Sequence, residues 1–419
     1  MIELAAGADP VASDLPRVLI YTQDSFGLGH LRRATNLANE LVARRQDVSV
    51  LLVVDSPVAP FFRLSPSIDF LKLPTVVKVG AGVFSPGRLQ TSYEQVKALR
   101  SGLLREAVLQ FAPHVLLVDH MPGGANRELM PALDAIRHRR LSTRLVLGLR
   151  DIIDEPSVTR SLWQREGVYQ ALRRNYQQVL IYGSPAVFAT AEEYRLQDAM
   201  VERVQYCGYV CNMAAVDEPR HVREQLGIQA EKIVTVMVGG GADALRLLRT
   251  YLEALPLLGS GHSLATVMVS GPFFPEQELR TLRERASRLG IHLCSSLGDS
   301  LSQINAADVV VGMAGYNTLS EILRFGKRAV IVPRAGPSAE QGMRARLFAA
   351  RGLIDVLEPA KLEARALATA LEQALSASAE QRPRSCPALD GVANATSALL
   401  GALPQAPVAA RESESRLAR

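Results

Sequence analysis

The sequence has few of the features that indicate a secreted, membrane-spanning or metal-built protein. It contains only four cysteines among 419 residues, and none of them forms a CxxC pair or accompanies a cluster of histidines. Neither a disulfide framework nor a zinc site is therefore expected, and buried thiols in a reducing compartment are the simpler interpretation. No apolar run reaches the length of about 18 residues that a membrane-spanning helix needs.

Charge of one sign is not in large excess either. The 47 Lys and Arg residues against 42 Asp and Glu residues give a net charge of only +5, which does not predict a nucleic-acid partner. Residues 1–16 lack the basic start and apolar run of a signal peptide and are expected to form a loose leader. We therefore expect a cytoplasmic protein, and a peripheral contact with anionic lipid at the inner face of the membrane stays open.

The composition and pattern that are present indicate a globular α/β protein. Hydrophobic residues make up 48% of the chain, and 419 residues exceed the size of a single core, so we expect two domains of about 200 residues each. Strand and helix patterns alternate through both halves, which predicts two doubly wound parallel sheets facing a cleft. The expected domains are residues 17–212 and 220–380. Within the first, residues 74–90 are expected to form a Gly/Pro-rich loop and residues 157–174 a helix.

The most informative stretch predicts a strand at Val309–Val311, a glycine turn, and a helix at Tyr316–Phe325. The unpaired amides and the dipole at such a helix start can receive a phosphate. Thr318 and Glu321 share one helix face, where a hydroxyl and a carboxylate could meet phosphate and sugar hydroxyls. The alternative is an ordinary turn, with Glu321 as a solvated or capping acid.

The loop that follows the next strand is polar and lies at the edge of the sheet where ligands bind. It offers Glu340, Gln341 and Arg344 as acceptor, donor and cation. The alternative is a helix start capped by Ser338, with Glu340 and Arg344 as an ion pair four residues apart. A second glycine turn, formed by Gly239, Gly240 and Gly241, follows the strand predicted at residues 232–238. It suits a phosphate or a tight turn.

The N-terminal half contributes a candidate base. Gly27 and Gly29 lie between a strand at Arg17–Tyr21 and a helix at Leu31–Arg45, without the full dinucleotide-binding fingerprint. His30 lies at the start of this helix, where the dipole favours the neutral imidazole that a general base needs. A polar residue without chemistry is the alternative.

Asp119 and His120 follow a strand predicted at residues 115–118, so they share an edge of the sheet with His30. They could bind an acceptor or orient a base. The alternative is that they cap their own loop.

Three segments, MAGYNTLSE (313–321), PRAGPSAEQGMRA (333–345) and GLGHLRRATNLANEL (27–41), resemble glycosyltransferase family 28. The last also resembles related nucleotide-sugar hydrolases. The resemblance implies the glycosyltransferase-B architecture, with a helix at residues 385–403 crossing back onto the first domain. The polar residues 404–419 that follow are expected to form a disordered tail. It places Gly315 and Thr318 near the nucleotide diphosphate, Glu321 on the ribose, and Glu340 and Gln341 on the donor sugar. Ala314 stands where the family often has serine.

The expected function is transfer of a sugar from a nucleotide-diphosphate sugar to an acceptor hydroxyl, with inversion and without a metal ion or cofactor. His30 or Asp119 would remove the acceptor proton, and helix dipoles and amides would stabilise the leaving diphosphate. The family includes the transferase that adds N-acetylglucosamine to the lipid-linked peptidoglycan precursor, so a lipid-linked or small-molecule acceptor stays open. The alternatives are a nucleotide-sugar hydrolase that uses the same donor site and a non-catalytic sugar-nucleotide binding protein.

Overall fold

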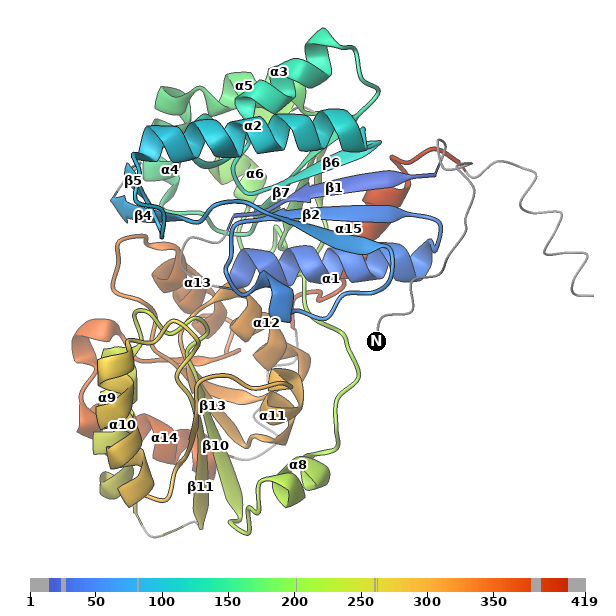
Figure 1. The fold of residues 1–419 in the computed structure, drawn as a ribbon. Coiled ribbons are helices and arrows are strands. Elements are labelled where there is room, and N and C mark those ends of the chain that lie inside the picture. Colours follow the sequence, from blue (N-terminus) through green and yellow to red (C-terminus); the bar gives the residue numbers. More distant parts are fainter. Residues whose placement is uncertain are drawn as a thin grey trace, which may run out of the picture.

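The computed structural model describes residues 15–23, 28–80, 83–200, 202–259, 261, 263–377 and 386–405. The expected leader and tail therefore lie almost entirely outside the described residues. The chain forms two parallel sheets, one in each half, which lie one above the other in Figure 1. The strands of one sheet lie within residues 17–212 and those of the other within residues 220–380, the ranges expected for the two domains.

The N-terminal sheet has seven strands in the order β3-β2-β1-β6-β7-β8-β9. Its strands are β1 (Arg17–Tyr21), β2 (Ser49–Val54), β3 (Ile68–Lys72), β6 (Val115–Asp119), β7 (Arg144–Arg150), β8 (Gln178–Tyr182) and β9 (Val204–Tyr206). The accompanying helices are α1 (Gly29–Arg44), α2 (Tyr93–Phe111), α3 (Met130–His138), α4 (Pro156–Glu166), α5 (Val168–Asn175), α6 (Thr190–Glu193) and α7 (Gln197–Met200), with 3-10 turns η1 (Ala59–Phe61) and η2 (Ala125–Arg127).

The C-terminal sheet has six strands in the order β12-β11-β10-β13-β14-β15. They are β10 (Lys232–Met237), β11 (Leu264–Val269), β12 (His292–Cys294), β13 (Val309–Gly312), β14 (Arg328–Ile331) and β15 (Asp355–Val356). The helices are α8 (Pro219–Gln225), α9 (Leu245–Ala254), α10 (Glu276–Arg288), α11 (Ser300–Ala306), α12 (Tyr316–Arg324), α13 (Glu340–Ala349), α14 (Ala364–Ser376) and α15 (Gly391–Leu400), with 3-10 turns η3 (Leu255–Leu257) and η4 (Pro359–Lys361). The predicted pair of doubly wound sheets is therefore confirmed.

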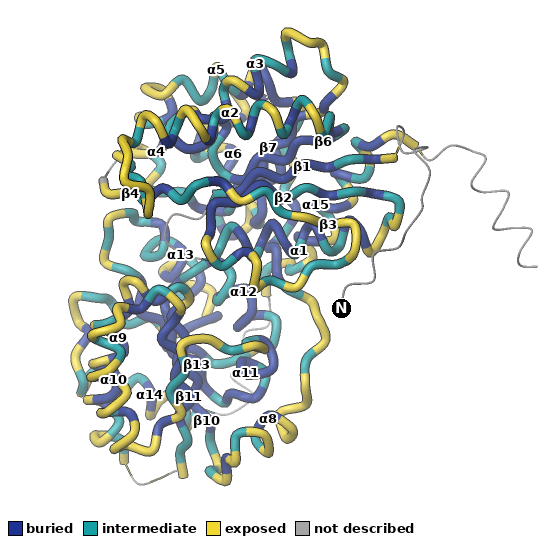
Figure 2. The backbone as a smooth tube through the Cα atoms, viewed as in Figure 1, coloured by how far each residue is buried: buried dark blue, intermediate teal, exposed yellow. Residues whose placement is uncertain are grey.

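The central strands, such as β1, β6, β10 and β13, are buried on both faces, as their continuous apolar runs predict. In β1, Val18 and Ile20 pack into the hydrophobic cluster beneath α1, whereas Leu19 and Tyr21 pack into the cluster beneath α2 and α3. Figure 2 shows the same pattern throughout, with buried strands inside and exposed positions on the outer helices. The cluster beneath α1 continues into α12 through Leu319, so the two domains share one core.

The final helix, α15, belongs to the C-terminal part of the sequence but packs on α1 of the N-terminal sheet (Figure 1). Arg44 Nη1 donates to Ala393 O at 2.9 Å, and Asn394 Nδ2 donates to Cys207 O at 2.9 Å. The first residue of α15 is Gly391, where an added Cβ would lie only 2.5 Å from Gly208 O. This glycine therefore allows the helix to approach the sheet closely.

Two local expectations are wrong. The helix expected at residues 157–174 is two helices, α4 and α5, because Gly167 adopts the left-handed conformation, with φ +69, between them. The loop expected at residues 74–90 contains an antiparallel hairpin, β4 (Val76–Gly80) and β5 (Val83–Pro86). Valine favours strands, and the valines of these two segments support this pairing in spite of the local glycines.

Candidate functional site

The candidate site lies where the carboxyl ends of central strands from the two sheets approach each other. In the C-terminal sheet, Met237 of β10 pairs with Gly312 of β13, so the turn at 239–241 and the turn before α12 are neighbours. In the N-terminal sheet, β1 and β6 are neighbours, which brings the start of α1 beside the end of β6. The two edges meet where Asn317 Nδ2 donates to Gly29 O at 3.1 Å.

His30 lies in the first turn of α1, which begins at Gly29. Its Nδ1 is 2.5 Å from Oδ2 of Asp119, and the histidine side chain is 17% exposed. Since an ionised carboxylate only accepts, Nδ1 is the donor in this contact, and the neutral form compatible with it is the tautomer with the proton on Nδ1. This tautomer is the one that a base acting through Nε2 requires.

Asp119 is buried and tightly paired. Arg33 donates to it from Nε at 3.2 Å and from Nη2 at 2.9 Å, and Thr22 Oγ1 donates at 3.4 Å. Burial by itself would raise the pKa of Asp119, but Arg33 and His30 outweigh it and hold the pKa well below its ordinary range. A carboxylate stabilised as an anion is a poor proton acceptor. The geometry therefore favours Asp119 as the group that orients His30 over Asp119 as the base.

His120 follows Asp119 with φ +75, and its ring centroid lies 5.3 Å from that of His30. Its Nδ1 is buried without a hydrogen-bond partner in the described part of the chain. Burial, followed by the charge of Arg150, holds the pKa of His120 well below its ordinary value. A neutral imidazole thus lies beside His30, which is compatible with the predicted acceptor side. Gly27, also predicted there, lies outside the described residues.

The glycine turn after β10 combines a structural requirement with open space. Gly241 has φ +90, and an added Cβ would lie 2.0 Å from Ser270 O, so backbone packing alone requires this glycine. Gly239 has φ +67, but an added Cβ there would meet no atom within 4 Å. Gly240 accepts a hydrogen bond from Phe273 N at 2.9 Å, which fixes the turn. Gly239 is the position that a ligand could approach most closely.

The start of α12 is similarly open. Gly315 is the N-cap residue, no side chain caps the helix, and an added Cβ would meet only Thr318 Oγ1, at 3.9 Å. The φ of Gly315 is −65, so glycine is not required by backbone conformation here. Its effect is to leave the helix start accessible beside the Thr318 hydroxyl, as a phosphate site needs.

Glu321 is almost fully buried at the domain interface, and its Oε1 lies 3.4 Å from Arg32 Nη1 of α1. Its Oε2 has no hydrogen-bond partner in the described part of the chain. Burial raises the pKa of Glu321, and Arg32 and Arg324 oppose this change. A buried carboxylate oxygen without a partner is costly. A ribose hydroxyl donating to Oε2 would remove that cost.

Arg344 differs from the expectation that it contacts the donor. It is fully buried, and it donates from Nη2 to Asp151 Oδ1 at 2.7 Å and from Nη1 to Ala314 O at 3.1 Å. Glu340 Oε1 lies 2.9 Å from Arg344 Nη2, and Glu340 Oε2 lies 3.0 Å from Arg150 Nη1. All three nitrogens of the Arg344 guanidinium are engaged, so its task is to join the domains. The predicted alternative, an ion pair four residues apart, is confirmed.

For the remaining polar residues of this loop, the donor contact of Gln341 stays a prediction, and the expected N-cap at Ser338 is wrong. Gln341 Oε1 accepts from Arg334 N at 3.0 Å, so only its Nε2 could donate to a sugar hydroxyl. Helix α13 is preceded by Ala339 as N-cap, and Ser338 Oγ accepts instead from Glu340 N at 3.2 Å. Hydrogen bonds at Arg334 and at Ser338 thus fix this loop beside the candidate donor site.

Sequence reasoning missed Tyr316, which lies between the Arg33–Asp119 pair and the Arg344–Asp151 pair. Its hydroxyl donates to Tyr182 O at 2.9 Å and accepts from Val210 N at 2.7 Å. The guanidinium of Arg33 lies 5.5 Å from its ring centroid, and that of Arg344 lies 5.6 Å away. A tyrosine directly after the turn glycine is the one signal that could have suggested an interdomain contact.

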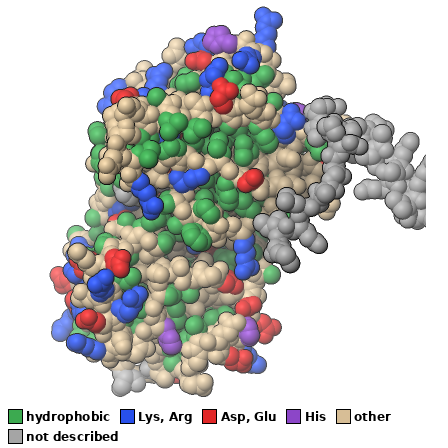
Figure 3. All heavy atoms as spheres, in the orientation of Figure 1, with side chains coloured by type: hydrophobic (Ala, Val, Ile, Leu, Met, Phe, Trp, Pro, Cys, Tyr) green, Lys and Arg blue, Asp and Glu red, His purple; other side chains and the backbone are tan. Residues whose placement is uncertain are grey.

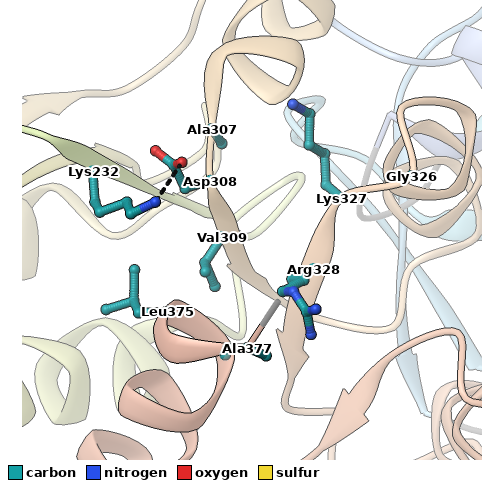
Figure 4. A pocket seen from close by; sticks show the side chains of 10 residues that line it. Lys232, Ala307, Asp308, Val309, Gly326, Lys327, Arg328, Leu375 and Ala377 are labelled. Atoms are coloured by element: carbon teal, nitrogen blue, oxygen red, sulfur yellow. Dashed lines mark ion pairs between the residues drawn. The ribbon is translucent and has the colours of Figure 1, made fainter. Parts of the chain in front are cut away.

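The hollow drawn in Figure 4 lies elsewhere. It has a volume of about 220 Å³ and is lined by residues at the amino ends of β10, β13 and β14, including Lys232 and Arg328. Lys232 Nζ and Asp308 Oδ1 form an ion pair at 3.6 Å within it. Ligands of open α/β sheets bind at the opposite, carboxyl edge, so we do not include this hollow in the candidate site.

Comparison of the whole chain with solved structures defines the class of fold. The chain is similar to a putative UDP-N-acetylglucosamine 2-epimerase from Listeria monocytogenes (TM-score 0.61, 13% identity, 93% of this chain and 96% of that one). It is also similar to MurG of Acinetobacter baumannii (TM-score 0.56, 13% identity, 92% of this chain and 100% of that one). The chain therefore has the two-domain glycosyltransferase-B architecture, as the resemblance implied.

Sequence comparison then shows what the C-terminal part is similar to. Residues 233–398 match the glycosyltransferase family 28 C-terminal domain. A segment of 146 residues is 24% identical to the Lactococcus lactis UDP-N-acetylglucosamine--N-acetylmuramyl-(pentapeptide) pyrophosphoryl-undecaprenol N-acetylglucosamine transferase. It covers 35% of this chain and 41% of that relative, so the match spans about two fifths of the relative's length. Among the described residues, no helix is both long and apolar enough to cross a membrane.

Proposed function

We propose that this protein is a glycosyltransferase that moves a sugar from a UDP-sugar to an acceptor hydroxyl. The observation that carries the proposal is the His30–Asp119 pair, held at the N-terminal edge that meets the α12 edge of the C-terminal sheet. A base and a phosphate-binding helix start on facing domains are what direct displacement of a nucleoside diphosphate requires. The choice of UDP as the nucleotide rests on two similar proteins whose names contain UDP-N-acetylglucosamine.

In the proposed reaction, Nε2 of His30 accepts the proton of the acceptor hydroxyl while Nδ1 remains hydrogen-bonded to Asp119. The acceptor oxygen forms a bond to the anomeric carbon as the bond from that carbon to the diphosphate oxygen breaks. A single displacement inverts the configuration. The leaving diphosphate meets the start of α12, the Thr318 hydroxyl and the turn at 239–241, so backbone amides and the helix dipole supply the positive potential without a metal ion.

The acceptor side is proposed to include the β4–β5 hairpin. Val79 and Val83 of this hairpin are exposed, as is Leu89 just after it. On the face shown in Figure 3, hydrophobic side chains gather across the middle of the N-terminal half, and charged side chains lie along the outer edges of both halves. An acceptor with an apolar tail would suit this surface, and would bring the protein to the cytoplasmic face of a membrane.

Product analysis tests the proposal. UDP-sugars that raise the melting temperature are first selected, because a ligand of the folded state stabilises it. Each is then incubated with and without acceptor hydroxyls, on carriers with and without an apolar tail. Formation of a glycoside and UDP supports the transferase. Release of free sugar at the same rate without acceptor would establish a hydrolase instead, and stabilisation without turnover under any condition would indicate a binding protein.

We expect Glu321→Ala to weaken UDP binding and leave the fold intact. Loss of a hydrogen bond from ribose to a charged group costs about 1.5–3 kcal/mol of binding free energy. Isothermal calorimetry with UDP measures the change. Glu284→Ala, at an exposed glutamate of α10, is the matched control. Equal UDP affinity in folded Glu321→Ala and wild-type protein would rule out the ribose contact.

We expect Gln341→Ala to weaken binding of the intact UDP-sugar and to change the affinity for UDP little, because Gln341 faces the sugar in this proposal. Gln341→Glu keeps an oxygen that accepts from Arg334 N but removes the donating Nε2 group, so it separates sugar binding from anchoring of the loop. Both variants should lose UDP-sugar affinity alike. If UDP and the UDP-sugar weaken equally, Gln341 contacts the diphosphate or only supports the loop.

A further inference from the structure

Arg33 is an unusual residue to find beside a proposed base. It lies in the first turns of α1, only 2% exposed, three residues after His30. Its Nη2 is 2.9 Å from both oxygens of Asp119, and the same nitrogen is 2.9 Å from Nδ1 of His30. Nδ1 of His30 thus touches an anion and a cation at once.

The charges of this cluster compensate each other. Burial by itself would lower the pKa of Arg33, but Asp119 outweighs it and raises that pKa, while the pKa of Asp119 is lowered. Both groups are therefore ionised, and their net charge is zero. Asp119 can still accept a hydrogen bond from the Nδ1–H group of His30, because a carboxylate has lone pairs beyond those that Arg33 uses.

Four further described residues lie around this cluster. On α1 itself, Arg32 lies further along and contacts Glu321 of α12. From the end of β6 come Asp119 and the ring of His120, the latter held neutral. From the C-terminal domain, Tyr316 of α12 packs against Arg33 with a neutral ring. Within the described part of the chain, Asp119 is thus an anion in direct contact with His30, and Arg33 is the cation paired with that anion.

We propose that Arg33 is a positioning residue that lets Asp119 orient His30 while keeping the imidazole neutral. A lone buried carboxylate would fix the ring but would also stabilise the imidazolium, which is not a base. A carboxylate already paired with Arg33 fixes the ring without that effect. The catalytic meaning of this arrangement rests on the proposed function, but the charge compensation itself does not.

NMR titration of the His30 ring in the intact chain tests the proposal without any substrate. Arg33→Met, which removes the cation and keeps an unbranched apolar stem, should raise the proton affinity of His30 by about tenfold or more. Its titration midpoint then moves to higher pH by at least about one unit. Arg33→Lys, which keeps the charge, should leave the midpoint close to that of the wild type.

Arg33→Met leaves Asp119 as an unpaired buried anion, so this variant could fail to fold. A second pair of variants tests the same proposal without that unpaired charge. Asp119→Asn leaves Arg33 as the uncompensated charge and should move the midpoint to lower pH. Adding Arg33→Met to Asp119→Asn should move it back up by about tenfold in proton affinity. Both backgrounds measure the same influence of Arg33 on His30.

An unchanged midpoint on removal of the Arg33 charge in a folded background would overturn the proposal. So would an equal shift in Arg33→Lys and Arg33→Met, which would indicate lost packing only. If turnover is measurable, the acidic limb of the kcat/KM profile should move to higher pH in Arg33→Met. A wild-type protein that shows no transfer would refute the proposed function and leave the titration result standing.

Discussion

Replacement of His30 by alanine should lower turnover by roughly 10²–10⁴-fold, the contribution expected of a general base. Donor affinity should change little, because the proposed donor contacts lie on the C-terminal domain. The acidic limb of the pH profile should disappear, since that limb would report protonation of His30. Steady-state kinetics of UDP release and calorimetry with UDP measure the two quantities separately.

His138→Ala is the control for this experiment, because His138 is exposed at the end of α3 and its Nδ1 contacts only the Asp134 carbonyl of its own helix. It should behave like the wild type. Near-normal turnover of His30→Ala together with tenfold weaker acceptor binding would mean that His30 positions the acceptor and another group removes the proton.

Arg344→Ala should lower the free energy of unfolding by about 3–5 kcal/mol, the cost of leaving a buried charge without its partner. The substitution removes the cation between Asp151 and Glu340 and leaves both carboxylates at the domain interface. Urea unfolding measures the loss. Arg346→Ala changes an exposed arginine of the same helix and should cost little.

A double variant sharpens this test. Arg344→Met with Asp151→Asn removes both charges of the strongest pair and should recover part of the lost stability, because an uncharged interface avoids the unpaired ion. A similar loss in the Arg344 and Arg346 variants would contradict the interdomain role. So would a double variant that is less stable than Arg344→Ala.

The sequence was sufficient for the fold because strands buried on both faces carry an unambiguous signal. Apolar runs such as Val309–Val311 and the glycine turns that follow them place each βαβ unit without knowledge of its neighbours. The two wrong predictions of secondary structure concern segments whose local sequence pattern is compatible with two different structures. The helical periodicity of residues 157–174 does not show that Gly167 is left-handed, and the glycines near Val79 concealed a hairpin.

The candidate site was harder because its charges are paired over long distances in the chain. Asp119 looked like a possible base in the sequence, since Arg33 lies 86 residues away and no local pattern joins them. Arg344 looked available for the donor because Asp151 is 193 residues away. Residue type and strand edge could be predicted, but which cation neutralises which anion depends on how the two sheets dock.

The packing of α15 on α1 bears on attempts to change donor preference by exchanging domains. The segment that matches the family 28 C-terminal domain ends at residue 398, inside a helix whose contacts are with the N-terminal sheet. A chimera that replaces the whole matched segment would import a foreign helix onto α1 and lose Asn394 beneath Cys207. Exchange should therefore stop after α14 and retain the native α15, so that the C-terminal module changes while the N-terminal domain keeps its own final helix.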